Sequence, residues 1–380
     1  MVKDLQETPI MKKTSIIGSI SIFILLLFHS CQAQKDSNIS ERFFSNDSKL
    51  DAQVQKHFDA MDERSRVAQM IVTSAGDLGK PDEVVYQLAQ DNQIGGVVFL
   101  KGTKQHHKAM IDSLNSISKA MGLAPLVFSI DAEPSLFNGR LSGFDPVINT
   151  IDIKTKEASD SIATLISNHL LEVGFHHNFA PVCDLSPQNE AIKNRSYGDD
   201  RDQVVALSKA FIKSSQEMGI VATAKHFPGH GLVKGDTHKK SVYIDGALKE
   251  LDVYPPLIDA GVISIMVAHI TVRNNEKYGT DGLPSSCSRT IVNDLLKEEL
   301  GFKGLVVTDA MNIMKAVTII DNAPLLASKA GCDVLLMPIY EKETIDSILA
   351  EMKRDEAYKK QVYDSVKKIV RMKICLGLLG

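Results

Sequence analysis

The chain has 380 residues, ordinary fractions of apolar and charged side chains, and a formal net charge of −4. This composition is typical of a globular protein, and the length allows either two domains or one large α/β barrel. The slight negative charge and the absence of a dense Lys/Arg stripe argue against nucleic acid as a partner.

The N-terminal residues have the pattern of a secretion signal. The basic pair Lys12 and Lys13 precedes an apolar run over 16–28, which is short for a membrane span, and Cys31 and Ala33 follow among small residues. We therefore expect an exported protein, which is either periplasmic or lipid-anchored at the cell envelope.

Residues 1–33 can be processed in two ways. The stretch ending at Cys31 resembles a bacterial lipoprotein box, in which this cysteine carries the lipid, whereas the alternative is ordinary cleavage after Ala33. We favour the lipoprotein signal. The residues that follow, 34–51, are polar and rich in Ser, Asn and Asp, and we predict a flexible linker.

From residue 52 onward, short apolar runs alternate with longer amphipathic stretches. The short runs predict strands at 68–74, 95–100, 125–130, 177–183, 220–224, 264–268, 304–308 and 333–337. The stretches between and after them predict helices at 104–121, 157–173, 201–218, 293–300, 342–353 and 355–374. This alternation is typical of parallel β/α units, and continuous apolar runs suit strands covered on both faces.

Polar residues at the strand ends separate two architectures, an open doubly wound sheet and a closed barrel. These residues are Asp131, Asp184, Lys225, His226, His269 and Asp309. A closed barrel brings the carboxyl ends of its strands to one mouth, whereas an open sheet spreads them along an edge. Because no Gly-rich phosphate motif follows the first strand, a dinucleotide fold is disfavoured. We predict a single α/β domain, a (β/α)8 TIM-type barrel over 52–380.

Two groups have the chemistry of a catalytic pair. Asp309 directly follows a predicted strand and could be a nucleophile that attacks a sugar carbon, or the N-cap of the next segment. Asp236 and His238 form an Asp-x-His pair in a predicted loop, where the carboxylate could orient an imidazole for acid/base work. The alternative for this pair is a salt-bridged surface turn.

Lys225 and His226 continue a strand, and a lysine there is expensive to bury without an acceptor. Asp131 could supply that acceptor and could also bind adjacent hydroxyls, while Asp184 is expected to tether the lysine or cap a loop. Arg195 lies in a polar loop that we place over the same mouth.

Several other residues have weaker assignments. His269 could line the pocket or be a structural histidine. The cysteines beyond the signal are Cys183, Cys287, Cys332 and Cys375, and their dispersed positions are typical of small buried side chains rather than disulfides or metal ligands. Since no metal-binding spacing occurs, we expect neither a metal nor a cofactor.

Taken together, these motifs resemble glycoside hydrolase family 3, in particular its β-N-acetylglucosaminidase branch. The resemblance rests on Lys225-His-Phe-Pro-Gly-His-Gly231 followed by Asp236-Thr-His238, and on Phe128-Ser-Ile-Asp131, Asn178-Phe-Ala-Pro-Val-Cys-Asp184, Asn194-Arg-Ser-Tyr-Gly198, Val267-Ala-His269 and Thr308-Asp-Ala-Met311. It covers nearly the whole barrel in order. It implies removal of terminal, non-reducing β-linked N-acetylglucosamine with retention of configuration.

The resemblance also implies residue roles. Asp309 becomes the nucleophile that forms a glycosyl-enzyme, and His238, held by Asp236, becomes the acid/base. The sugar-binding roles pass to the residues that match the family motifs, which are Asp131, Arg195, Lys225 and His226. The implied partner is an N-acetylglucosamine oligosaccharide or a muropeptide, and we expect a monomer.

The loop after Asp131 departs from the family pattern. The branch usually has Asp-x-Glu-Gly-Gly-Arg, whereas this chain has Pro134 and Ser135 at the glycines and its nearest arginine at Arg140. The contact of Arg140 with substrate is therefore open. Two alternative functions also remain open on the same barrel, a phosphorylase of the same glycosides and a non-catalytic glycan-binding lipoprotein.

Overall fold

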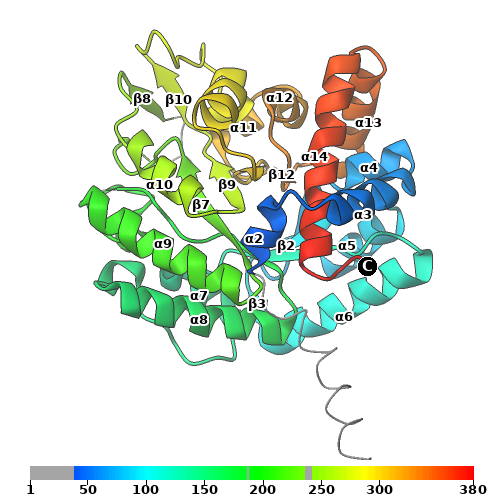
Figure 1. Cartoon of the computed structure of the whole chain (residues 1–380), viewed down its shortest axis with the longest axis horizontal. Coiled ribbons are helices and arrows are strands. Elements are labelled where there is room, and N and C mark those ends of the chain that lie inside the picture. The colour runs from blue at the N-terminus through cyan, green and yellow to red at the C-terminus, as the bar shows by residue number, and fades with distance from the viewer. Residues whose placement is uncertain (1–37, 186–187, 236–241) are drawn as a thin grey trace, which may run out of the picture. The chain divides into compact units, whose positions relative to one another are not determined.

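The computed structural model describes residues 38–185, 188–235 and 242–380. Within them, eight parallel strands form one sheet in the order β11-β9-β7-β6-β4-β2-β1-β12 (Figure 1). The strands are β1 (Ile71–Ala75), β2 (Gly96–Phe99), β4 (Val127–Ile130), β6 (His177–Asn178), β7 (Val221–Phe227), β9 (Ser264–Val267), β11 (Leu305–Thr308) and β12 (Leu335–Leu336). Each strand overlaps the run predicted for it, so all eight predicted strands are confirmed.

The two ends of this sheet meet and close it into a barrel. Val307 of β11 forms a parallel bridge with Val334, the residue before β12. The carbonyl oxygen of Val306 accepts hydrogen bonds from the backbone N–H groups of Asp333 at 2.7 Å and Val334 at 3.1 Å. Closure pairs the last two edges with each other, as a barrel requires. The predicted (β/α)8 barrel is confirmed.

Helices connect the strands and cover the barrel from outside. They include α4 (Glu63–Ala68), α5 (Asp82–Gln90), α6 (Lys104–Met121), α8 (Lys156–Val173), α9 (Arg201–Glu217), α10 (Tyr254–Asp259), the π-helix η5 (Thr290–Glu299), α11 (Lys315–Thr318), α12 (Ala323–Ala330), α13 (Glu341–Met352) and α14 (Glu356–Cys375). Figure 1 shows α6, α8 and α9 side by side around one part of the barrel. The bounds of α6 are those predicted, and the other long helices overlap their predicted ranges.

Local sequence explains the ends of these helices. The hydroxyl of Thr103 accepts a hydrogen bond from the N–H of His106 at 3.1 Å and caps the start of α6. The helix ends at Gly122, whose φ of 66° lies in the left-handed region that favours glycine. Thr155 and Gly174 play the same two roles for α8.

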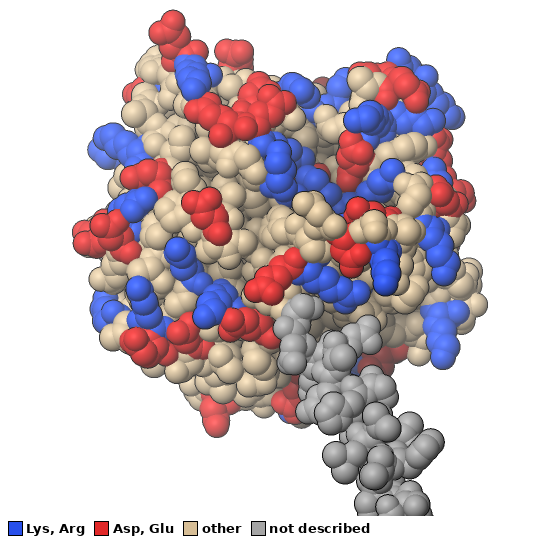
Figure 2. All heavy atoms as spheres, viewed as in Figure 1, with Lys and Arg blue, Asp and Glu red and all other residues tan. Residues whose placement is uncertain are grey.

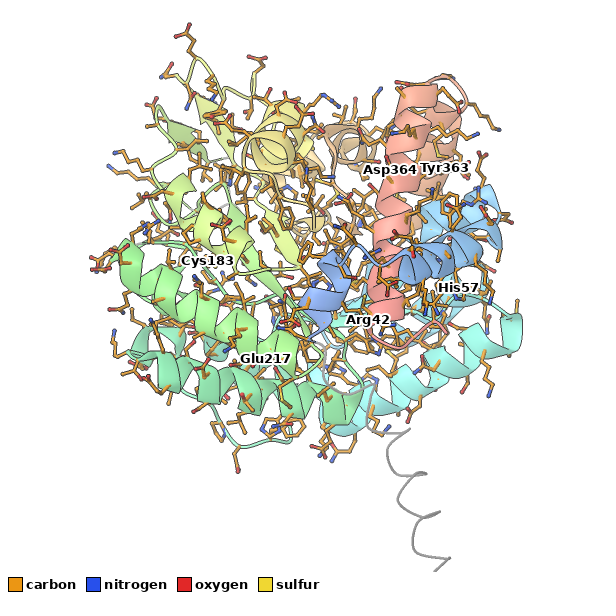
Figure 3. The ribbon with its side chains drawn as sticks, viewed as in Figure 1. Arg42, His57, Cys183, Glu217, Tyr363 and Asp364 are labelled. Carbon is orange, nitrogen blue, oxygen red and sulfur yellow. The ribbon has the colours of Figure 1, made fainter. Side chains whose placement is uncertain are left out.

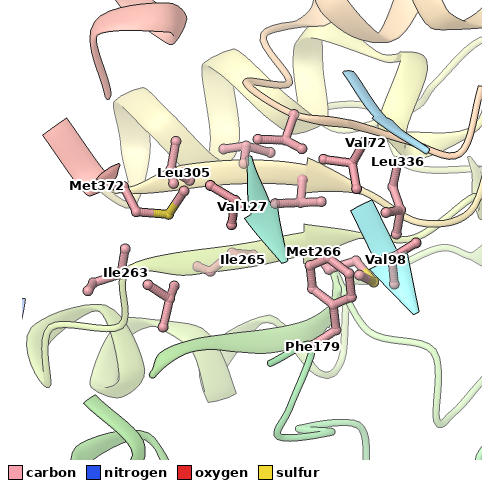
Figure 4. Packing of buried hydrophobic residues seen from close by; sticks show 14 of the residues in the cluster. Val72, Val98, Val127, Phe179, Ile263, Ile265, Met266, Leu305, Leu336 and Met372 are labelled. Carbon is pink, nitrogen blue, oxygen red and sulfur yellow. The ribbon is translucent and has the colours of Figure 1, made fainter. Parts of the chain in front are cut away.

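The strands are covered on both faces, as their continuous apolar runs predicted. All residues of β1, β2, β4 and β11 are buried. Figure 4 shows Val72, Val98, Met266 and Leu336, which come from four different strands, packed together.

The segment before the barrel is helical, so the prediction of a flexible linker over 34–51 is wrong for residues 38–51. These residues form α2 (Ile39–Phe44) and the start of α3 (Ser48–Asp59). Asn38 and Asp47, which we had taken for linker residues, cap the two helices by accepting hydrogen bonds from the backbone N–H two residues further on. Their polar composition therefore reflects helix capping rather than disorder.

Most of the large apolar residues of α2 and α3 are buried, and both helices pack against the C-terminal helix. Phe43 is 4% and Leu50 2% exposed, and Figure 1 shows α3 alongside α14. The rings of Phe58 and Tyr363 meet edge to face with their centroids 5.0 Å apart. Figure 3 places Tyr363 and His57 on these two neighbouring helices. The unit that contains the barrel therefore begins at Asn38.

Other features of the described residues bear on earlier expectations. Cys183, labelled in Figure 3, and the other three cysteines of the barrel are buried and free, as predicted. Figure 2 shows basic and acidic side chains interspersed over the face that it draws. Among the described helices, none has both the length and the apolar character to cross a membrane.

The packing of α3 predicts a matched pair of stability effects. Leu50→Ala should lower the free energy of unfolding by about 2–5 kcal/mol, because it leaves a cavity in a buried contact. Lys49→Ala, at the exposed neighbouring position, should change it by less than about 0.5 kcal/mol. Urea denaturation measures both. An unchanged midpoint in Leu50→Ala would mean that this segment is not part of the folded unit.

Candidate active site

A cavity of about 560 Å³ lies at the carboxyl ends of the barrel strands. Its wall includes residues that the sequence singled out, namely Asp131 after β4, Lys225 and His226 in β7, Arg195 in the loop after β6, Arg140, and Asp309 after β11. Because the carboxyl ends of parallel strands converge in a closed barrel, residues distant in sequence share this one mouth.

Lys225 is the central charge of the cavity and is 2% exposed. Its ammonium group forms ion pairs with the Asp131 carboxylate and, at 3.1 Å, with Oε1 of Glu133. Burial acts to raise the pKa of Asp131, but the positive charges of Lys225, Arg140 and Arg195 outweigh it and hold that pKa below its ordinary value. The buried lysine, for which the sequence predicted one acceptor, therefore has two, Asp131 and Glu133.

Glu133 is a functional residue that the sequence analysis missed. It is fully buried, and it accepts two hydrogen bonds from Arg195, from Nε at 3.0 Å and from Nη2 at 2.8 Å. This bidentate pair fixes the guanidinium plane of Arg195 beside the lysine. Its signal in the sequence was the glutamate of the family pattern Asp-x-Glu, two residues after Asp131.

Arg140 reaches the cavity despite the unusual loop before it. It donates from Nη1 to the carbonyl oxygen of Leu100 at 3.1 Å, and its Nη2 lies 3.5 Å from Asp131. The loop leads into α7 (Pro134–Arg140), in which Pro134 occupies the first turn, where proline is favoured. Ser135 ties this helix to Asn194, whose carbonyl oxygen accepts a hydrogen bond from the serine hydroxyl at 2.7 Å.

Asp184 holds the two histidines of the Lys225–Gly231 motif rather than the lysine. Its Oδ2 lies 2.6 Å from Nδ1 of His226, and its Oδ1 accepts a hydrogen bond from the backbone N–H of His230 at 2.8 Å. Burial acts to raise the pKa of Asp184, yet the charge and hydrogen bond of His226 lower it overall. Of the two roles expected of Asp184, the tether to the lysine is replaced by a contact with His226, whereas the cap of a loop is present in the hydrogen bond from the N–H of His230.

A second buried carboxylate, Glu250, supports the same loop and was not predicted. It accepts hydrogen bonds from the N–H groups of Leu185 at 2.7 Å, Gly231 at 3.2 Å and Leu232 at 3.0 Å. Burial and the nearby Asp184 raise the pKa of Glu250 to about 8, while these N–H groups act in the opposite direction. A side chain on Gly231 would place Cβ 1.6 Å from the carbonyl oxygen of Leu185, so only glycine fits.

Asp309 lines the cavity with its carboxylate close to its own strand end. The N–H of Ala310 donates to its Oδ1 at 2.7 Å. Burial acts to raise the pKa of Asp309, but the charges of His226 and His269 and this N–H outweigh it, so the pKa is lowered. The carboxylate is therefore ionised at neutral pH, which is the state that a nucleophile requires.

His269 differs from the expectation for a substrate-binding residue. It is buried, it is not among the side chains that line the cavity, and its Nδ1 lies 2.6 Å from the hydroxyl of Ser286. Burial lowers its pKa, whereas the Asp309 carboxylate raises it. The side chain of His269 is therefore buried close to Asp309, and its role in substrate binding stays a prediction.

The predicted acid/base pair, Asp236 and His238, lies outside the described residues. The described chain on either side of this pair ends at Gly235 and resumes at Val242. The roles given to Asp236 and His238 stay predictions.

The closed barrel, with carboxylates and cations gathered at the carboxyl ends of its strands, defines an enzyme of the (β/α)8 class. Residues 62–372 match the family described as "Glycosyl hydrolase family 3 N terminal domain". The chain therefore belongs to glycosyl hydrolase family 3, and it is a glycoside hydrolase.

Named relatives agree with this family. A beta-hexosaminidase of Vibrio cholerae serotype O1 is 29% identical over 262 residues, which cover 66% of this chain and 77% of the relative. Among solved structures, a family 3 β-N-acetylglucosaminidase from Paenibacillus sp. superposes with a TM-score of 0.77 at 26% identity, covering 84% of this chain and 63% of its own. A β-N-acetylhexosaminidase from Beutenbergia cavernae superposes with a TM-score of 0.73 at 25% identity. The match covers 81% of this chain and 97% of that protein. This chain thus spans less than two thirds of the Paenibacillus protein.

The buried ion pair of Glu133 and Lys225 predicts that loss of one charge strongly lowers the stability of the protein. Glu133→Gln should lower the free energy of unfolding by about 3 kcal/mol, because it leaves buried cations without one of their anions. Glu299→Gln, at a largely exposed ion pair with Lys277, should leave the urea midpoint unchanged. Equal midpoints for the two variants would contradict the buried network.

Proposed function

We propose that this protein is a retaining exo-glycosidase that removes terminal, non-reducing β-linked N-acetylglucosamine. The observation that carries the proposal is that the ionised Asp309 shares one cavity with the buried network of Lys225. The names of the relatives, beta-hexosaminidase and β-N-acetylglucosaminidase, support this substrate class.

In the first step, Asp309 attacks the anomeric carbon and forms a glycosyl-enzyme while the glycosidic oxygen leaves. His238, oriented by Asp236, donates a proton to that oxygen. In the second step the same imidazole takes a proton from water, whose oxygen displaces Asp309 and restores the original configuration. The support for these roles of His238 and Asp236 is the sequence motif.

The charged residues of the cavity are suited to hold the sugar. Asp131 is 19% exposed, and a carboxylate has about four acceptor sites, so its contacts with Lys225 and Arg140 leave capacity for neighbouring hydroxyls. Arg195 and His226 border the same space and offer donors. Lys225 has three donors, and its two carboxylates hold it in position while it binds a sugar oxygen.

We further propose that the mature enzyme acts outside the cytoplasm, at the envelope or in the periplasm. The support is the basic pair, the apolar run and Cys31 in the first 33 residues of the sequence. Muropeptides and chitin fragments are both N-acetylglucosaminides that such an enzyme would meet.

Substitution of the nucleophile tests the proposal. Asp309→Asn should lower turnover of the p-nitrophenyl β-N-acetylglucosaminide by roughly three orders of magnitude, equivalent to about 4 kcal/mol of barrier. Asp364→Asn, on the exposed face of α14 (Figure 3), should leave turnover unchanged. Equal turnover in the two variants would refute the role of Asp309.

Product analysis separates the proposed hydrolase from a phosphorylase. With chitobiose and added inorganic phosphate, we expect free N-acetylglucosamine. Hydrolysis gives two molecules of N-acetylglucosamine per chitobiose and no sugar 1-phosphate. Equimolar N-acetylglucosamine and sugar 1-phosphate would show that phosphate, and not water, is the acceptor.

A further inference from the structure

The wall of the active cavity is divided into a charged sector and an uncharged sector. Around the barrel from β4 through β6 to β7, the wall carries Asp131, Arg140, Arg195, Lys225 and two histidines. From β11 through β12 and β1 to β2, the described wall beyond Asp309 is entirely apolar. It is formed by residues such as Ile313, Met314, Leu336, Met337, Leu78 and Leu100.

This uncharged sector includes large apolar side chains that are open to solvent. Leu78, in the loop after β1, is 61% exposed, and Ile313, in the loop after β11, is 52% exposed. Two more large apolar side chains, Ile339 at 42% and Tyr340 at 66% exposed, follow β12 and line a second hollow of about 230 Å³. Large exposed apolar side chains that rim a cavity mark a binding surface.

Asp309 lies at the boundary between the two sectors. It directly follows β11. On one side of it, beyond Met266 of β9, lies the charged sector that begins at β7, and on the other side the uncharged sector begins with the next residue, Ala310. A sugar that satisfies its hydroxyls in the charged sector has its anomeric carbon at Asp309. The part of the substrate beyond that carbon then extends over the apolar side chains.

We infer that the cavity selects N-acetylglucosaminides whose leaving group carries an apolar segment, such as an alkyl chain, and that Leu78 and Ile313 bind it. The inference rests on the proposed function. The acetamido methyl group of the sugar is a competing occupant, but one methyl group is small beside two large side chains that are each more than half exposed.

Two glycosides with the same chemistry at the scissile bond test this inference. Methyl and hexyl β-N-acetylglucosaminides release alcohols of similar acidity, so their kcat/KM values differ through binding of the chain. Burial of two methylene groups contributes about 0.8 kcal/mol each, which raises kcat/KM more than tenfold. We expect kcat/KM to be about tenfold higher, or more, for the hexyl glycoside.

Leu78→Asn and Ile313→Thr should reduce the hexyl-to-methyl ratio towards one. Leu165→Asn, on α8 and 40% exposed, is the matched control and should keep the wild-type ratio. Thermal denaturation checks that all three variants are folded.

The remaining outcomes overturn the inference in distinguishable ways. Equal kcat/KM for the two glycosides in the wild-type protein would overturn the inference and leave the proposed function intact. An equal loss on both glycosides in Leu78→Asn or Ile313→Thr, with the ratio unchanged, would assign the apolar sector to the acetamido methyl. Hydrolysis of neither glycoside would overturn the proposed function as well.

Discussion

The site depends on one constraint, the burial of the Lys225 ammonium group at the mouth of the barrel. A charge removed from water is costly unless it is paired and hydrogen-bonded. Here Asp131 and Glu133 bind it from the end of β4, and Arg195 binds Glu133 beside it through the same Oε1. Any displacement of β4 against β7 would leave one of these charges unpaired, so the network fixes the two strand ends relative to each other. The same rigidity makes it suitable to hold a sugar, because the binding groups need no reorganisation.

Two further buried carboxyl groups, Asp184 and Glu250, fix the loop that follows β7. Asp184 binds the histidines of the motif that begins at Lys225, and Glu250 binds three backbone N–H groups around Gly231. Buried carboxyl groups are expensive unless they are hydrogen-bonded. Asp184 is compensated by an imidazole and a backbone N–H, and Glu250, whose pKa is raised to about 8, by three backbone N–H groups. The loop that leaves β7 is therefore anchored at its base. Asp309, across the mouth, has a lowered pKa because His226, His269 and the N–H of Ala310 favour its charged form, so the cavity combines fixed donors with an ionised carboxylate.

Much of this could be predicted from the sequence, for identifiable reasons. Continuous apolar runs gave the eight strands, and polar residues directly after those runs gave Asp131, Lys225, His226 and Asp309. Other features arise only in three dimensions. Glu133 reads as a loop residue until Arg195, 62 positions later, lies against it. His269 follows its strand like the others, yet it is buried and is not among the side chains that line the cavity. Residues 38–51 look polar because Asn38 and Asp47 are helix caps, and their buried partners in α14 lie more than 300 residues away.

The central claim is that the charged sector holds the sugar and thereby places its anomeric carbon at Asp309. A crystal structure of the protein with N-acetylglucosamine bound tests this most directly. The account predicts ring hydroxyls within hydrogen-bond distance of Asp131, Lys225 and Arg195, with C1 facing the Asp309 carboxylate. A sugar bound over the apolar sector, or one whose C1 points away from Asp309, would contradict it.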